Sequence, residues 1–292
     1  MIEEIIIFST ISGGVYALLA LGFTLIYGVS GVVNLAHGSF YMLGAYMFYV
    51  FGTFLLKLPP VLALILAVVF VGIVSSILYR VTIHPVLGDE VGVMVVTVCL
   101  ALIFQQLMLL VFGPPNVPVA SLVKGSVIIL DVTVTYARIL ALAVSILLFV
   151  SLWVFISKSK VGKAMRAVSQ DREVAMLMGI NTERLYMLAM AVSSMLAAIA
   201  GIFIAGSTTG VAGAWIWMHP LALSFSIVIL GGLGSVKGSL IGGFIIGYAE
   251  QTVAIAAPEG GAIISVVPFT VMVLVLLLRP KGLFGKRIEM ED

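Results

Sequence analysis

The chain has 292 residues, of which 62% are hydrophobic and 10% are charged. A soluble domain has roughly 45–50% apolar and about 25% charged residues, so this chain has too few charges to cover a soluble surface. Its mean hydropathy of +1.27 indicates that lipid is the solvent. A net charge of +2 argues against nucleic-acid binding. The single cysteine, Cys99, excludes an intrachain disulfide, and no His, Cys and carboxylate cluster has metal-ligand spacing.

Apolar runs long enough to cross a bilayer recur along the chain, because a spanning helix needs about 20 mostly apolar residues. They lie at 5–29, 35–56, 61–80, 91–112, 136–157, 185–206, 217–233, 236–257 and 263–279. The first run lacks a basic flank, which favours a retained span over a cleaved signal. The seventh is short, which predicts a half-helix. The expected fold is one all-α transmembrane domain over residues 1–292, a polytopic bundle of about eight or nine helices with broken or half helices.

Basic residues cluster in residues 158–184 and in the C-terminal tail, and such clusters mark cytoplasmic segments. With nine crossings, only Lys57, Lys124 and Arg138 fall outside. The distribution predicts a multi-pass protein of the inner (cytoplasmic) membrane, with its N-terminus outside and its C-terminus in the cytoplasm. The loop at 113–135 is then external. It starts with turn-forming residues, and its β-branched run at 126–136 favours a short extended segment.

The predicted cytoplasmic loop at 158–184 is compatible with two short helices, at about 162–169 and 172–178. Asp171 can cap the second helix, and Gly179 tolerates the left-handed conformation that ends it. Val174, Leu177 and Met178 lie on one face of that helix. The face suits either a groove on a soluble partner or the inner leaflet of the membrane, and both alternatives stay open on spacing alone.

A glycine-rich break precedes the second apolar run and carries Asn34, His37, Gly38 and Ser39. Non-helical backbone at membrane depth is tolerated inside protein or beside a water-filled cavity, where it can hold a polar ligand. Asn34, His37 and Ser39 are therefore candidates for the wall of a translocation path. The alternative is that Asn34 and His37 only cap the following helix at the inner interface.

Glu250, followed by Gln251, is the acid placed well inside an apolar run, and an ionisable residue there is costly. Glu250 and Gln251 are candidates for the path. Because the topology puts Glu250 in the outer third of the membrane, the alternative is a side chain that reaches the outer surface. Gln105 and Gln106 are a weaker case. Trp215, Trp217 and His219 are predicted to lie at the interface.

Glycines are dense from residue 231 to residue 247, and their spacing permits close helix packing. We assign glycines of this run, and Gly38 of the first break, to helix packing or helix breaks. They are Gly38, Gly231, Gly232, Gly234 and Gly238. The packing partner is either this subunit or a second permease, and direct contact with substrate is the alternative.

Four stretches resemble ABC importer permeases for branched-chain amino acids. The run at 162–181, which begins Gly-Lys-Ala-Met-Arg-Ala-Val-Ser-Gln-Asp, is similar to the family's coupling loop. The run at 27–46 is similar to the signature at the start of the second helix. The glycine run at 231–243 and the C-terminal run at 278–285 are similar to the late motifs. They occur in family order over nearly the whole chain. The Asn-Leu-Ala-His-Gly form at 34–38 resembles the LivH-type subunit more than its LivM-type partner.

The resemblance implies an ABC importer permease fold and a permease subunit that forms the translocation path for branched-chain, hydrophobic amino acids. The implied partners are a second, LivM-type permease, two ATPase subunits and an extracytoplasmic substrate-binding protein, besides membrane lipid. Coupling to the ATPases is then assigned to Gly162, Arg166, Asp171, Val174, Leu177, Met178 and Gly179. The chain lacks the phosphate-binding motif GxxxxGK[ST], so ATP is expected on the partner subunits and no cofactor on this chain.

Three other functions compete with this one. A secondary transporter driven by an ion gradient would need embedded acids or a proton relay, for which Glu250 is poor support. The same permease type could carry urea or short amides, and no residue decides between these substrates. A membrane enzyme would need a catalytic constellation, and none is present in the sequence, so no residue is assigned a catalytic role.

Overall fold

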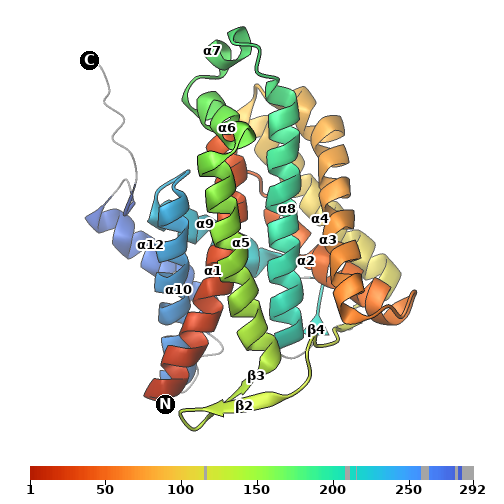
Figure 1. The fold of residues 1–292 in the computed structure, drawn as a ribbon, viewed down its shortest axis with the longest axis vertical. Coiled ribbons are helices and arrows are strands. Elements are labelled where there is room, and N and C mark those ends of the chain that lie inside the picture. The colour runs from red at the N-terminus through yellow and green to blue at the C-terminus, as the bar shows by residue number, and fades with distance from the viewer. Residues whose placement is uncertain (115–116, 208–210, 215, 258–262, 280–281, 285–292) are drawn as a thin grey trace.

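The computed structural model describes residues 1–114, 117–207, 211–214, 216–257, 263–279 and 282–284. These residues form a helical bundle around α1 (Ile2–Ser30), which packs against α5 (Tyr136–Lys158), α8 (Thr182–Ser207), α9 (Met218–Gly231) and α10 (Val236–Ala256) (Figure 1). From Gly13 to Ile26 every residue of α1 is buried. The first helix of the chain is therefore the centre of the fold.

Six helices among the described residues are long and apolar enough to cross a membrane. They are Ile2–Ser30, Pro60–Val86, Glu90–Phe112, Tyr136–Lys158, Thr182–Gly206 and Val236–Ala256. All six were predicted, with boundaries that differ by a few residues. Within the second of them, α3 (Pro60–Leu78) continues through a π-helical turn and a 3-10 turn, whereas Glu90–Phe112 is the single helix α4. The expectation of an all-α polytopic bundle is confirmed.

The other three predicted spans are shorter or broken. The second is α2 (His37–Tyr49), which runs on as a π-helix over Val50–Phe54. The seventh is α9, with 14 residues, as expected for a half-helix. The ninth is the 3-10 turn Ile264–Val266 followed by α12 (Val267–Leu278). Broken elements are therefore present, but the second span starts two residues later than predicted and inside the bundle.

The two ends of the bundle carry different segments. The N-terminus lies at one end with the segment between α4 and α5, whereas α6 (Lys160–Gln170) and α7 (Arg172–Leu177) project from the other end (Figure 1). At the α6 end, the backbone N–H groups of Leu283 and Phe284 donate to the carbonyl groups of Leu230 and Gly231, at 2.8 and 3.1 Å. The N-terminus and the last described residues thus lie at opposite ends, as an odd number of crossings requires.

The segment before α5 contains a β-hairpin. β2 (Ser126–Ile129) pairs antiparallel with β3 (Val132–Thr135). Leu130 and Asp131 form its two-residue turn with φ of 49° and 60°, the left-handed conformation that the twist of a tight hairpin requires. The extended segment was predicted, but its fold-back was not. A second short pair joins β1 (Val117–Pro118) to β4 (Val211–Ala212).

The break at 31–36 runs from the exposed Gly31 at the end of α1 into the bundle, where His37 contacts α1 and α8 near their midpoints. The His37 ring bonds the Leu19 carbonyl through Nε2 at 3.0 Å and the Ser193 hydroxyl through Nδ1 at 3.3 Å. The Leu35 N–H donates to the Thr97 hydroxyl at 3.1 Å. Neighbouring helices therefore supply the hydrogen bonds that a broken helix loses in lipid.

α9 also begins inside the bundle, directly against the start of α2. Gly38 packs on the carbonyl of Trp217 and on Leu221, so closely that a side chain at this position would collide with backbone. The Trp217 indole is buried and donates to Gln105 at 2.6 Å. The prediction that Trp217 lies at the interface is therefore wrong, and Trp215 lies outside the described residues.

Glycines let α1, α9 and α10 approach closely. Gly231 and Gly238 pack backbone against backbone, joining the end of α9 to the start of α10. Gly243 packs on Ala17 of α1, where a Cβ would lie 2.6 Å from the Ala17 Cα and N. The glycine-dense run is thus used for packing within this subunit. Gly232 and Gly234 have φ of 97° and 77° in the turn between α9 and α10.

We expect the substitution Gly243→Ala to destabilise the protein by about 1–3 kcal/mol, because a methyl group there forces two helix backbones apart. Gly88→Ala is the matched control, since the same methyl group meets no atom within 4 Å at that position. Thermal unfolding of the purified protein in detergent would measure both. Equal melting temperatures for the two variants would contradict the close-packing argument.

Candidate functional site

The two helices predicted between residues 158 and 184 are confirmed as α6 and α7. The Ser159 hydroxyl caps α6 by accepting from the Gly162 N–H at 2.9 Å, and the Asp171 carboxylate caps α7 by accepting from the Val174 N–H at 3.0 Å. Gly179 has φ of 80°, the conformation that favours glycine after a helix. Local capping therefore shapes this segment as the sequence indicates.

Two further residues attach α6 to the end of α5. Gly162 lies against the backbone of Phe155 and Ile156, leaving no space for a side chain. The Arg166 guanidinium donates to the Ser157 carbonyl at 3.1 Å. Because a helix end leaves carbonyl groups without intrahelical partners, Arg166 satisfies one of them and holds α6 at a defined angle.

The apolar face of α7 points away from the bundle. Val174, Leu177 and Met178 are 53, 86 and 78% exposed, whereas Ala175 is buried against the protein. α7 projects beyond the transmembrane helices at the end opposite the N-terminus (Figure 1). The structure therefore gathers the predicted coupling residues on one projecting element, with apolar side chains that this chain does not cover.

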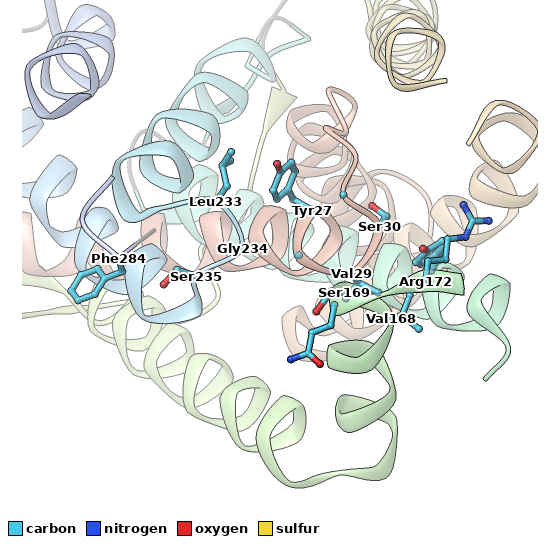
Figure 2. Close-up of a pocket in the computed structure, with 14 residues that line it drawn as sticks. Tyr27, Val29, Ser30, Val168, Ser169, Arg172, Leu233, Gly234, Ser235 and Phe284 are labelled. Atoms are coloured by element: carbon cyan, nitrogen blue, oxygen red, sulfur yellow. The ribbon is translucent and has the colours of Figure 1, made fainter. Parts of the chain in front are cut away.

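A cavity of about 560 Å³ lies beside this element. We call it the junction cavity, and its lining comes from the end of α1, the α6–α7 junction, Tyr186, the α9–α10 turn and the C-terminal segment. The lining residues are Tyr27, Gly28, Val29, Ser30, Gly31, Val168, Ser169, Gln170, Arg172, Tyr186, Leu233, Gly234, Ser235 and Phe284. Figure 2 shows that Arg172 and Ser30 lie on one side of it, and Ser235 and Phe284 on the other. Residues from all four motif stretches meet here.

The junction cavity has a mixed lining. Its polar groups include the hydroxyl groups of Ser30, Ser169 and Ser235 and the guanidinium of Arg172, and the described lining contains no Asp or Glu. The guanidinium of Arg172 lies over the ring of Tyr186, with its Cζ 5.7 Å from the ring centroid. In the described part of the chain, no carboxylate lies within ion-pair distance of Arg172. The described lining therefore carries one guanidinium group and no carboxylate beside an aromatic wall.

The predicted path residues of the first break are buried and bonded within the subunit. Asn34 is 3% exposed, and its side chain accepts from the Ala36 N–H at 3.0 Å. His37 and Ser39 are fully buried, and the Ser39 hydroxyl donates to the Ala36 carbonyl at 2.7 Å. The Asn34 bond lies in the turn before α2, and no side chain caps the first turn of that helix, so the structure does not show Asn34 or His37 as its caps.

Glu250 is fully buried, which excludes the alternative of a side chain that reaches the surface. Its carboxylate lies 3.3 Å from Nε2 of His219 at the start of α9, and Tyr16 of α1 interacts with it electrostatically. The neighbouring Gln251 donates to the Ser12 hydroxyl at 3.2 Å. These residues form a polar centre between α1, α9 and α10, at the start of α9.

His219 is the partner that sequence reasoning missed, because it was placed at the membrane interface. The available signal was a histidine at the start of a short helix together with one acid in the next helix. A buried acid needs a polar partner, so the histidine at the start of the neighbouring helix was the residue to test.

The architecture defines a class. Six long apolar helices, two helices that begin inside the bundle and a projecting polar element at one end describe a polytopic membrane protein of the transport type. In solved structures, the chain is similar to PsaBC from Streptococcus pneumoniae, in complex with Fab. The TM-score is 0.54 at 14% sequence identity, over 96% of this chain and 97% of that one. That likeness concerns the fold alone.

Sequence comparisons identify the family. Residues 5–276 match the family model described as branched-chain amino acid transport system / permease component, and the chain belongs to this family. It is 32% identical to the high-affinity branched-chain amino acid transport system permease protein LivH of Escherichia coli K12, over 94% of this chain and 92% of that protein. It is 30% identical to the corresponding BraD of Pseudomonas aeruginosa, with the same coverage.

Membership of this family settles the class of function. The chain is a multi-pass permease component of an ABC transport system, a transport protein that carries out no catalysis itself. The competing functions of a gradient-driven transporter and a membrane enzyme are therefore set aside. ATP hydrolysis and substrate capture in such a system belong to other subunits.

We expect His219→Ala to destabilise the protein by roughly 2 kcal/mol, because it leaves the buried Glu250 carboxyl group without its imidazole partner. Adding Glu250→Leu should recover most of the loss, since it removes the buried polar group that has lost its partner. Thermal unfolding of the single and double variants tests this, with His84→Ala at an exposed position as the control. Additive effects of the two substitutions would contradict the pairing.

Proposed function

We propose that this chain is the LivH-type permease of an importer for leucine, isoleucine and valine. It pairs with a second, LivM-type permease to enclose the translocation path, and an extracytoplasmic binding protein delivers the substrate. The LivH and BraD relatives, which are permease proteins of branched-chain amino acid transport systems, support this substrate class. A transport system for urea or short amides is the alternative that a substrate measurement would separate.

In this proposal the α6–α7 end of the bundle faces the cytoplasm of an inner-membrane protein. The basic residues of 158–184 support this orientation, because cytoplasmic loops carry the excess of Lys and Arg. The N-terminus, with Glu3 and Glu4, and the β2–β3 hairpin then face outward. The last described residues, which bond to the end of α9, face the cytoplasm.

The observation that carries the proposal is the exposed apolar face of α7. Leu177 and Met178 project from a water-facing element that also carries Arg172 and Glu173, and this chain covers neither apolar side chain. An apolar helix face that rises clear of the bundle suits the groove of a soluble partner. One ATPase subunit would dock on α7 of this permease, and a second would dock on the partner permease. Closure of the two ATPase subunits would move α7, and the movement would pass through α6 to α5 and α1.

The path itself would form where this permease meets its partner. Glu250 and Gln251 remain candidates to act on it, since the partly exposed His219 links the buried Glu250 to the surface of the subunit. Asn34, His37 and Ser39 would act indirectly by holding the start of α2, because their side chains are buried and bonded. Substrate that crosses would meet the starts of two half-helices.

We expect the double substitution Leu177→Asp and Met178→Asp to abolish copurification of the ATPase subunits, because two acids replace the apolar contact. Membrane insertion should be unchanged, since neither side chain packs on the bundle. The control is Leu130→Asp, which places an acid at a 66% exposed apolar position in the hairpin at the opposite end. ATPase subunits retained by the double variant would remove the docking proposal.

We expect cysteines at positions 177 and 130 to react with a membrane-impermeant thiol reagent from opposite sides of the membrane. The native Cys99 is exposed on α4, so it is first replaced by serine. In intact cells, position 130 should be labelled and position 177 should be labelled only after lysis. Labelling of position 177 from outside the cell would reverse the orientation and end the proposal.

A further inference from the structure

The junction cavity lies between two parts of the protein that the proposed mechanism moves relative to each other. Val168, Ser169 and Arg172 belong to the segment that would receive the ATPase movement. Ser30, at the end of α1, lies on the same side as Arg172. The opposite side, with Ser235 and Phe284, belongs to the start of α10 and to the C-terminal segment. A ligand in this cavity would touch both parts at once.

The lining fits a small molecule with one carboxylate and one apolar end. Arg172 offers charged donors, and in the described lining no acid competes for it. Tyr27, Leu233 and Phe284 offer apolar surface. The glycines at 28 and 31 bring the backbone at the end of α1 into the lining, where helix carbonyl groups can accept from an ammonium group. These are the groups of a hydrophobic amino acid.

The size of the cavity agrees with this ligand. A volume of about 560 Å³ lies within the roughly 300–1,000 Å³ of typical small-molecule sites. It leaves space for water around an amino acid. The cavity also opens at the α6 end, which is the side where imported solute would accumulate.

We propose that the junction cavity is a regulatory site that binds the imported hydrophobic amino acid from the cytoplasmic side. The carboxylate binds Arg172, and the side chain lies against Tyr27, Leu233 and Phe284. The identity of the ligand, and the side of the membrane from which it binds, rest on the proposed function. Because the ligand bridges the α6–α7 junction and the ends of α1 and α10, it stabilises one relative position of these parts and slows the ATP-driven cycle.

The test uses the assembled transporter in lipid vesicles, with the ATPase subunits facing the bulk solution. The binding protein and leucine are enclosed to sustain ATP hydrolysis, and L-leucine is then titrated into the bulk solution. ATP hydrolysis should fall several-fold at saturation. Rates are normalised to the rate of each variant without added leucine, so a general loss of activity does not count as inhibition.

Arg172→Gln should raise the half-inhibitory concentration of leucine about tenfold, because a charge-assisted hydrogen bond is lost. Arg184→Gln is the matched control. It removes the same charge from the same end of the protein, at an exposed position that does not line the cavity. L-leucinamide, which lacks the carboxylate, should not inhibit the parent protein.

A second measurement reports on the cavity directly. In a Cys99→Ser background, a cysteine at position 169 should react with an impermeant thiol reagent in the assembled transporter, and L-leucine should slow the reaction. If the ATPase subunits block this cysteine whether or not leucine is present, the cavity is a protein contact and the proposal is overturned.

The failures of the two proposals are distinguishable. Binding-protein-dependent uptake of leucine with no inhibition from the bulk side would overturn the regulatory site and leave the proposed function standing. Equal inhibition of the Arg172 and Arg184 variants, or inhibition by leucinamide, would also overturn the site. Absence of leucine uptake by the parent transporter would overturn the proposed function itself.

Discussion

The demand that every backbone polar group be satisfied inside lipid governs this fold. Unbroken helices meet the demand internally, and six described helices do so over lengths that span a bilayer. Where α2 begins inside the bundle, neighbouring helices must supply the missing partners. Thr97 and Leu19 do this for the first break. The breaks are therefore possible only because α1, α4 and α8 surround them.

The same demand explains why the starts of α2 and α9 lie against each other. Each exposes polar backbone, and contact between them leaves that backbone inside protein instead of lipid. Gly38 permits the contact because any side chain would collide with the Trp217 carbonyl. A permease needs a region where helices end within the membrane, and this pair supplies one while staying closed within the subunit. The polar centre of Glu250 and His219 lies at the start of α9 and adds a contact between a carboxyl group and an imidazole to this region.

Much of the fold could be predicted from the sequence, because hydropathy and capping are local. The apolar runs located the long helices, and Asp171 and Gly179 located the limits of α7. Depth was harder, because composition alone does not say where in the membrane a helix starts. The break before His37 depends on hydrogen bonds to Thr97 and Leu19 on other helices. The burial of Trp217 depends on Gln105, which lies more than a hundred positions away in the sequence. The contact between Glu250 and His219 likewise depends on tertiary structure. So does the junction cavity, because residues from distant parts of the sequence line it.

The central position of α1 has a consequence for biogenesis. This helix is synthesised before α10, yet its hydroxyl at Thr24 bonds Ser239 and its small residues receive Gly243 and Gly247 of α10. Those partners are synthesised more than two hundred residues later. Until then α1 must wait in the bilayer or beside the insertion machinery with part of its polar face uncovered. Completion of the core is thus delayed until α10 has been synthesised, and truncated chains that lack α10 should be substrates for membrane quality control.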